Sequence, residues 1–162
     1  MTLYRYYEAE RAREGWVTFD DMLLEGWEAL LRFEDLRARA QQAYDHVLVD
    51  EFQDVSRVQH QLLDVLTAPH RNYMAVGDDD QCIYEWRGAN PSFILDFREE
   101  YEADEYLIRD TFRSQAPHTV LANAVIAHND HRREKHLNLT RGFGGSTQVH
   151  AADGADAEAT HV

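Results

Sequence analysis

The sequence lacks the features that would place the protein in a membrane or in an oxidising compartment. Its 162 residues contain one cysteine, Cys82, so a disulfide framework is excluded. No apolar run is longer than a few residues, which excludes a membrane-spanning helix. The first residues, MTLYRYYEAERARE, hold no apolar secretory core, so no signal peptide is expected. We therefore predict a cytoplasmic protein with no membrane partner.

Lysine is almost absent as well. Lys135 is the only lysine among 16 basic residues, and 30 acidic residues give a formal net charge of −14. This composition is typical of proteins that stay soluble in high salt, although a GC-rich genome that favours arginine codons would produce it too. Because so acidic a chain is a poor general binder of polyanions, any contact with nucleic acid must be local.

The hydrophobic pattern alternates between short strands and amphipathic helices. Apolar spacing and capping residues predict helices at 4–14, at 19–31 behind a Thr18–Asp21 capping box, after Ser56, from Pro91 and from Pro117. Short apolar runs predict strands at 46–49, which we expect to be buried, and at 72–76, 105–108 and 147–151. In the helix from Pro117, the residues expected inside are Val120, Leu121, Ala124 and Val125. The alternation predicts an α/β fold with a parallel sheet flanked by helices.

Unusual polar residues fall at the carboxyl ends of the predicted strands. Asp50-Glu51 follows the first strand, Asp78–Gln81 the second and Arg113 the third. Ligands of parallel sheets bind beyond these ends, so the three groups are expected to converge on one crevice.

The carboxylate pair suits hydrolysis of a nucleotide phosphoanhydride. One carboxylate can hold Mg²⁺ and the other can accept a proton from an attacking water. The amide of Gln81 can contact a γ-phosphate or that water without adding charge. The structural alternatives are that Asp50 and Glu51 cap the following turn, and that residues 77–81 form an acidic surface turn.

Two further groups suggest contacts with nucleotides. Tyr84, Trp86 and Arg87 place two aromatic rings and a cation within four residues, a combination that stacks unpaired bases and contacts their backbone. Arg113 can neutralise charge on a transferred phosphoryl group, and the neighbouring Phe112 can stack on a nucleobase. The alternatives are core packing for the rings and a surface ion pair for Arg113.

A third group, the histidines at 128, 131 and 136, lacks the cysteine or carboxylate that would complete a zinc site.

Four stretches together resemble the superfamily I DNA helicases of the UvrD/Rep type. VTFDDML resembles the return from the inserted helical subdomain, VLVDEFQD the Walker B motif, VGDDDQCIYEWRGA the third motif and IRDTFRS the fourth. The resemblance covers residues 4–150 and implies a partial RecA-like P-loop NTPase fold. Residues 1–40 would end the helical subdomain, 41–105 would form the C-terminal half of the first RecA-like domain, and 106–162 would begin the second.

The resemblance also implies a role for each site residue. On the nucleotide side, Asp50 and Glu51 would hold Mg²⁺, with Glu51 as catalytic base, Gln53 and Asp54 would belong to the same motif, and Gln81 would sense the γ-phosphate of ATP. Also on the nucleotide side, Arg113 would be the arginine finger and Phe112 would stack on adenine. On the DNA side, Tyr84 and Trp86 would stack on single-stranded DNA, and Arg87 would link the DNA and ATP sites.

The sequence departs from the family in two respects. It contains no G-x-x-x-x-G-K-[ST] phosphate loop, and Glu85 stands where the family usually has glycine. We therefore expect an internal segment of the helicase that is marginally stable alone, hydrolyses ATP negligibly and has the rest of the helicase as a partner.

The sequence thus predicts part of an ATP-dependent 3′–5′ DNA helicase or translocase acting in DNA repair or replication. One alternative is a non-catalytic remnant or binding module that keeps the fold without the chemistry. The other is a metal-dependent phosphoesterase using Asp50, Glu51 and Asp78–Asp80 around two cations.

Overall fold

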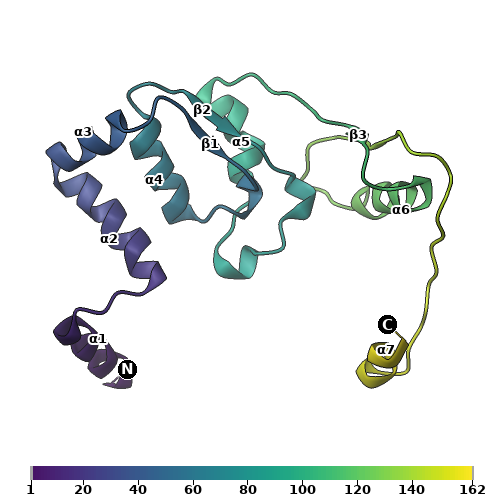
Figure 1. Ribbon diagram of the computed structural model, residues 1–162, viewed down its shortest axis with the longest axis horizontal. Helices are drawn as coiled ribbons and strands as arrows, with labels where there is room; N and C mark the ends of the chain where they lie inside the picture. Colours follow the sequence, from purple (N-terminus) through teal and green to yellow (C-terminus); the bar gives the residue numbers. More distant parts are fainter. Residues whose placement is uncertain (1, 162) are drawn as a thin grey trace. The chain divides into compact units, whose positions relative to one another are not determined.

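A computed structural model describes residues 2–161. The chain divides into two compact units, Met1–Asp104 and Glu105–Val162. Each unit contains a small parallel sheet flanked by helices, so the predicted α/β class is confirmed (Figure 1). None of the helices in residues 2–161 combines the length and apolar character needed to cross a bilayer.

Within residues 2–104, the first unit contains five α-helices, three short 3₁₀ helices and two strands. In chain order these are α1 (Thr2–Glu14), α2 (Phe19–Arg32), α3 (Glu34–Gln42), β1 (Val47–Val49), η1 (Phe52–Asp54), α4 (Arg57–Thr67), β2 (Tyr73–Ala75), η2 (Asp79–Gln81), η3 (Glu85–Arg87) and α5 (Ser92–Tyr101).

Capping side chains define where α2 and α4 begin. The Thr18 and Ser56 hydroxyls each accept a hydrogen bond from the backbone N–H three residues later. The side chains of Asp21 and Gln59 in turn accept a hydrogen bond from the backbone N–H of the capping residue. Both capping boxes stabilise the first turn by satisfying N–H groups that lack a helical partner. The predicted start of each helix is confirmed. Helix α3 was not predicted, because its polar sequence EDLRARAQQ carries no apolar stripe.

Helices α4 and α5 cover one face of the β1–β2 pair (Figure 1). The strands run parallel, with Leu48 opposite Met74. At the centre of this core lies the Phe52 ring, which is fully buried and meets the Phe97 ring edge-on at 5.3 Å. Tyr73 of β2 also packs against Phe97, at 5.0 Å between ring centroids. The aromatic core therefore fixes the segment just after β1 against both the sheet and α5.

The opposite face of the same sheet is open. Leu48 is 70% exposed and Met74 is 54% exposed. The prediction that the first strand is buried is therefore wrong for its central residue. The reason is that α4 and α5 cover one face only, and no other element of the first unit, as described from residue 2 to residue 104, packs over Leu48.

Two tyrosines at the edge of this core remain protonated at ordinary pH. Burial raises the pKa of the Tyr73 phenol, and the nearby negative charges of Asp64 and Glu100 add to the effect. Burial likewise raises the pKa of Tyr101, whose hydroxyl donates to the Asp64 carboxylate.

The second unit contains β3 (Asp110–Thr111), α6 (Ala116–Ile126), β4 (Asn138–Leu139) and α7 (Ala155–His161). The strands pair in parallel, and the predicted helix from Pro117 is confirmed as α6. The predicted strands at 105–108 and 147–151 are wrong. A strand requires a partner that completes its hydrogen bonds, and neither segment pairs with another within residues 2–161.

The apolar side of α6 is also not where we expected it. Val120, Leu121 and Val125 are 56%, 47% and 62% exposed, and Ala124 is exposed as well. The buried positions of this helix are Ala116 and Thr119 instead. The two-residue strands of this unit are too short to cover a helix face.

Removing the α4 cap should weaken the first unit. Ser56→Ala leaves the Gln59 N–H without its hydroxyl acceptor, so we expect the free energy of unfolding to fall by about 1 kcal/mol. Urea unfolding followed by far-UV circular dichroism measures this loss. Ser146→Ala, at an exposed position outside any helix, should change little. An equal loss in both variants would contradict the role of the cap.

Candidate functional site

Two adjacent carboxylates follow β1. Asp50 and Glu51 are both exposed, and the Glu51 N–H donates to Asp50 Oδ1 at 2.9 Å. Glu51 has a φ of 51°, in the left-handed region that is unfavourable for residues other than glycine. The backbone therefore holds a strained residue at the position that the sequence predicts to be a catalytic base.

A buried glutamine joins these carboxylates to the loop after β2. Gln53 is 1% exposed, although its side chain ends in a polar amide. Its Nε2 donates to Glu51 Oε2 at 2.8 Å, and its Oε1 accepts from the Asp78 N–H at 3.0 Å. A buried amide costs free energy unless its polar atoms form hydrogen bonds. Moving the two loops apart would break these bonds, so the Gln53 side chain holds the loops in place relative to each other.

The chain of contacts continues to Gln81. Asp78 Oδ2 accepts from Gln81 Nε2 at 2.6 Å, and Asp78 Oδ1 accepts from the Asp80 N–H at 3.2 Å. Side-chain and backbone hydrogen bonds thus run from Glu51 through Gln53 and Asp78 to Gln81. The sequence suggested no bridging role for Gln53 or Asp78, because residues 53 and 78 meet only through the pairing of the two strands.

The backbone clamps the same two loops at both ends. Phe52 N–H donates to Val76 O at 2.9 Å, and Asn90 N–H donates to Val55 O at 3.3 Å. Between these clamps, Gly77 lies so close to its neighbours that a Cβ there would stand 2.5 Å from Gln53 Oε1. The sequence shows a glycine in a turn, whereas the structure shows that its missing side chain makes room for the bridge.

The carboxylates at this site suit a hard cation. Asp50 and Glu51 offer exposed oxygens, and within residues 2–161 neither forms an ion pair with arginine or lysine. Asp54 Oδ1 is buried and has no hydrogen-bond partner in the same described part of the chain. Oxygen donors of this kind are the ligands that Mg²⁺ prefers, so the residues present fit the predicted ion.

Cys82 follows Gln81 in the second loop. Burial raises the pKa of its thiol, and the carboxylates of Glu85 and Asp54 add to the effect, while a backbone hydrogen bond involving Tyr84 opposes it. The thiol therefore stays protonated near neutral pH and supplies no nucleophile.

The aromatic pair projects from the surface. Trp86 is 79% exposed and Tyr84 is 39% exposed, with ring centroids 6.5 Å apart. The Arg87 guanidinium lies 5.5 Å from the Trp86 ring and 5.9 Å from the Tyr84 ring. Core packing, the alternative weighed for these rings, is therefore wrong for Trp86. The exposed rings and the cation form an amphipathic surface group.

Phe112 and Arg113 belong to the second unit, where they follow β3. Phe112 is 73% exposed, and the Arg113 carbonyl accepts from Arg141 Nη1 at 3.3 Å. Within the first unit the structure joins the ends of β1 and β2. The approach of Arg113 to Glu51 and Gln81 stays a prediction.

Comparison with known proteins gives the family context of this site. Residues 1–102 match the family model described as the UvrD/REP helicase N-terminal domain. The chain is 35% identical over 161 residues to the ATP-dependent DNA helicase PcrA of Leuconostoc citreum, a match covering 99% of this chain and 22% of that protein. It is 34% identical over 160 residues to the ATP-dependent DNA helicase Rep of Escherichia coli K12, covering 98% of this chain and 24% of Rep. The chain thus spans about a fifth to a quarter of the relatives it matches.

A matched pair of glycine substitutions tests the tight contact at Gly77. Gly77→Ala places a Cβ 2.5 Å from Gln53 Oε1 and 2.7 Å from Ile94 Cδ1, so we expect a loss of about 1–3 kcal/mol in unfolding free energy. Gly26→Ala lies inside α2 with nothing within 4 Å of the new Cβ and should gain up to about 1 kcal/mol. Urea unfolding measures both. A neutral Gly77→Ala would show that the two loops are loosely held.

Proposed function

The chain belongs to the UvrD/Rep family of DNA helicases, and we propose that it forms the coupling segment of a 3′–5′ DNA helicase or translocase. In this proposal the segment links ATP hydrolysis to movement along single-stranded DNA during repair or replication. The observation that carries it is the hydrogen-bonded bridge from Glu51 through Gln53 to the loop holding Gln81. Because these hydrogen bonds join the two loops, a movement of one loop requires a movement of the other.

The proposed nucleotide site uses the residues at the ends of β1 and β2. Asp50 and Glu51 would hold Mg²⁺, which when bound would neutralise charge on the ATP phosphates. The Glu51 carboxylate would accept the proton of the attacking water. Gln81 would contact the γ-phosphate or that water, while Gln53 and Asp54 orient the loop. Support comes from the exposed carboxylates and from the buried amide that positions one of them.

The proposed DNA contact is the surface group of Tyr84, Trp86 and Arg87. Exposed rings can stack on successive unpaired bases whatever their sequence, and an adjacent guanidinium can contact the backbone. Because the chain carries a charge of −14, this contact must be local. Three residues lie between Gln81 and Glu85, where η3 begins, so the nucleotide and DNA contacts lie on one continuous stretch of chain.

The rest of the site would come from elsewhere in the helicase. Arg113 is proposed as the arginine finger and Phe112 as the ring that stacks on adenine, both from the second unit. The phosphate loop, which residues 1–162 do not contain, would be supplied by the remainder of the helicase as the partner of this segment.

One alternative function retains support. Because residues 1–162 contain no phosphate loop, the segment could bind single-stranded DNA through its exposed rings without hydrolysing ATP. The phosphoesterase hypothesis has less support, since both carboxylate oxygens of Asp78 are engaged by Asp80 and Gln81 within its own turn.

The role of Glu51 can be tested in a chimera where residues 1–162 replace the matching segment of Escherichia coli Rep. We expect ATP hydrolysis that depends on single-stranded DNA. Glu51→Gln should bind ATP but lose about 10²–10⁴-fold in turnover, because the amide cannot accept the proton. Glu25→Gln, on the exposed side of α2, is the matched control. Full turnover in Glu51→Gln would remove Glu51 as the base, and a chimera that binds DNA without hydrolysis would favour the binding-module alternative.

The role of Trp86 can be tested with the chain alone. Fluorescence anisotropy of a labelled oligothymidine at low salt should show single-strand binding that Trp86→Ala weakens by about 1–3 kcal/mol, because a stacked base is lost. Trp16→Ala removes a ring that is 63% exposed and lies outside the proposed DNA group, so binding should not change. Equal affinities for the wild type and both variants would place the DNA contact elsewhere.

A further inference from the structure

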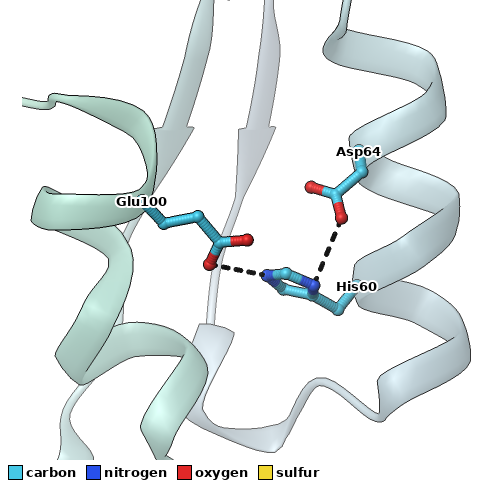
Figure 2. Close-up of side chains that lie close together, drawn as sticks. All are labelled: His60, Asp64 and Glu100. Atoms are coloured by element: carbon cyan, nitrogen blue, oxygen red, sulfur yellow. Dashed lines mark ion pairs between the residues drawn. The ribbon is translucent and has the colours of Figure 1, made fainter.

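A second cluster of metal-ligating side chains lies on the helices behind the sheet. His60 and Asp64 come from α4, and Glu100 comes from α5 (Figure 2). His60 Nδ1 lies 3.4 Å from Asp64 Oδ2, and His60 Nε2 lies 3.7 Å from Glu100 Oε2. None of these residues takes part in the site proposed for nucleotide or DNA.

The histidine is held in place before any ligand arrives. His60 is 5% exposed, and its ring stacks on Phe93 at 4.2 Å with an interplanar angle of 16°. The Tyr101 hydroxyl lies 3.3 Å from His60 Nε2. A ring fixed by packing presents its nitrogens in set directions, which lowers the entropy lost when a ligand binds.

The two carboxylates are placed differently. The side chains of Asp64 and Glu100 are 39% and 44% exposed, so an ion can reach them from solvent. Among residues 2–161, no arginine or lysine forms an ion pair with either of them. The cluster therefore combines a buried nitrogen donor with two oxygen donors whose negative charge is not offset by a permanent cation.

The spacing suits a transition-metal ion. One donor atom from each residue lies within 4.8 Å of the other two. The contacts to Asp64 and Glu100 start from different nitrogens of the imidazole, and a single ion binds only one of these nitrogens, so the shared spacing is that of one donor atom from each residue. Rotation of the carboxylate that faces the other nitrogen would bring one donor atom of each residue to a single ion. Three protein ligands would leave a fourth position for water.

We propose that His60, Asp64 and Glu100 form a Zn²⁺-type site that joins α4 to α5. Imidazole with carboxylates suits Zn²⁺ and its transition-metal neighbours, whereas Mg²⁺ prefers oxygen ligands only, so the ion differs from the one proposed near Asp50. The bound ion links the two helices that pack around Phe52, the residue next to Gln53. Binding stabilises the first unit without taking part in nucleotide chemistry.

Isothermal titration of the full chain with Zn²⁺ in excess Mg²⁺ tests this site. We expect one equivalent to bind, a rise in the melting temperature, and a visible Co²⁺ spectrum typical of tetrahedral coordination. Glu100→Gln, at an exposed position, should weaken Zn²⁺ binding more than about tenfold with an unchanged circular dichroism spectrum. Glu99→Gln, next to it on α5 and exposed, is the matched control.

Histidine variants complete the test. His60→Gln should abolish the binding, and His46→Gln, outside the cluster, should keep it. If His60→Gln fails to fold, Glu100→Gln carries the result alone. The proposal is overturned if the wild type binds no stoichiometric Zn²⁺, or if Glu100→Gln binds as tightly as Glu99→Gln. Binding lost instead in Asp79→Asn would assign the ion to the acidic turn at 78–80.

Discussion

The candidate site depends on one buried amide. Gln53 is almost completely removed from water, and its two polar atoms satisfy the loops after both strands, through Glu51 on one side and Asp78 on the other. A side-chain amide offers a donor and an acceptor at the same branch point, whereas an ionised carboxylate offers acceptors alone. Without it, the backbone clamps at Phe52 and Val55 would still hold the loops together, but the Glu51 side chain would lose its partner.

The same arrangement explains how a weak sheet can support a precise site. Each strand of the first unit has three residues, which is too short to order two loops by ladder bonds alone. The rings around Phe52 supply the missing rigidity, because they fill the space between the sheet, α4 and α5. Packing against one face of the strands thus determines where the carboxylates beyond the end of β1 lie.

Local signals predicted the helices well and the strands less well. The boxes at Thr18 and Ser56 can be recognised from four consecutive residues each, so the starts of α2 and α4 followed from the sequence. The strand predicted at 147–151 failed because a partner, and not local composition, decides whether a strand forms. The bridge through Gln53 could not be predicted for the same reason, since it joins residues 25 positions apart. The sequence shows His60 and Asp64 four residues apart in one helix, which places both on one face of α4. The third member of the second cluster, Glu100, lies on α5, and no sequence spacing links it to the other two.

The left-handed backbone at Glu51 has a geometric consequence for the carboxylate pair. Along an extended strand, successive side chains point to opposite sides of the sheet, so neighbours in sequence cannot serve one ligand. A residue with φ near 51° interrupts this alternation directly after β1. The interruption removes the constraint that would hold the Asp50 and Glu51 side chains on opposite sides of the sheet, and it places backbone strain at residue 51.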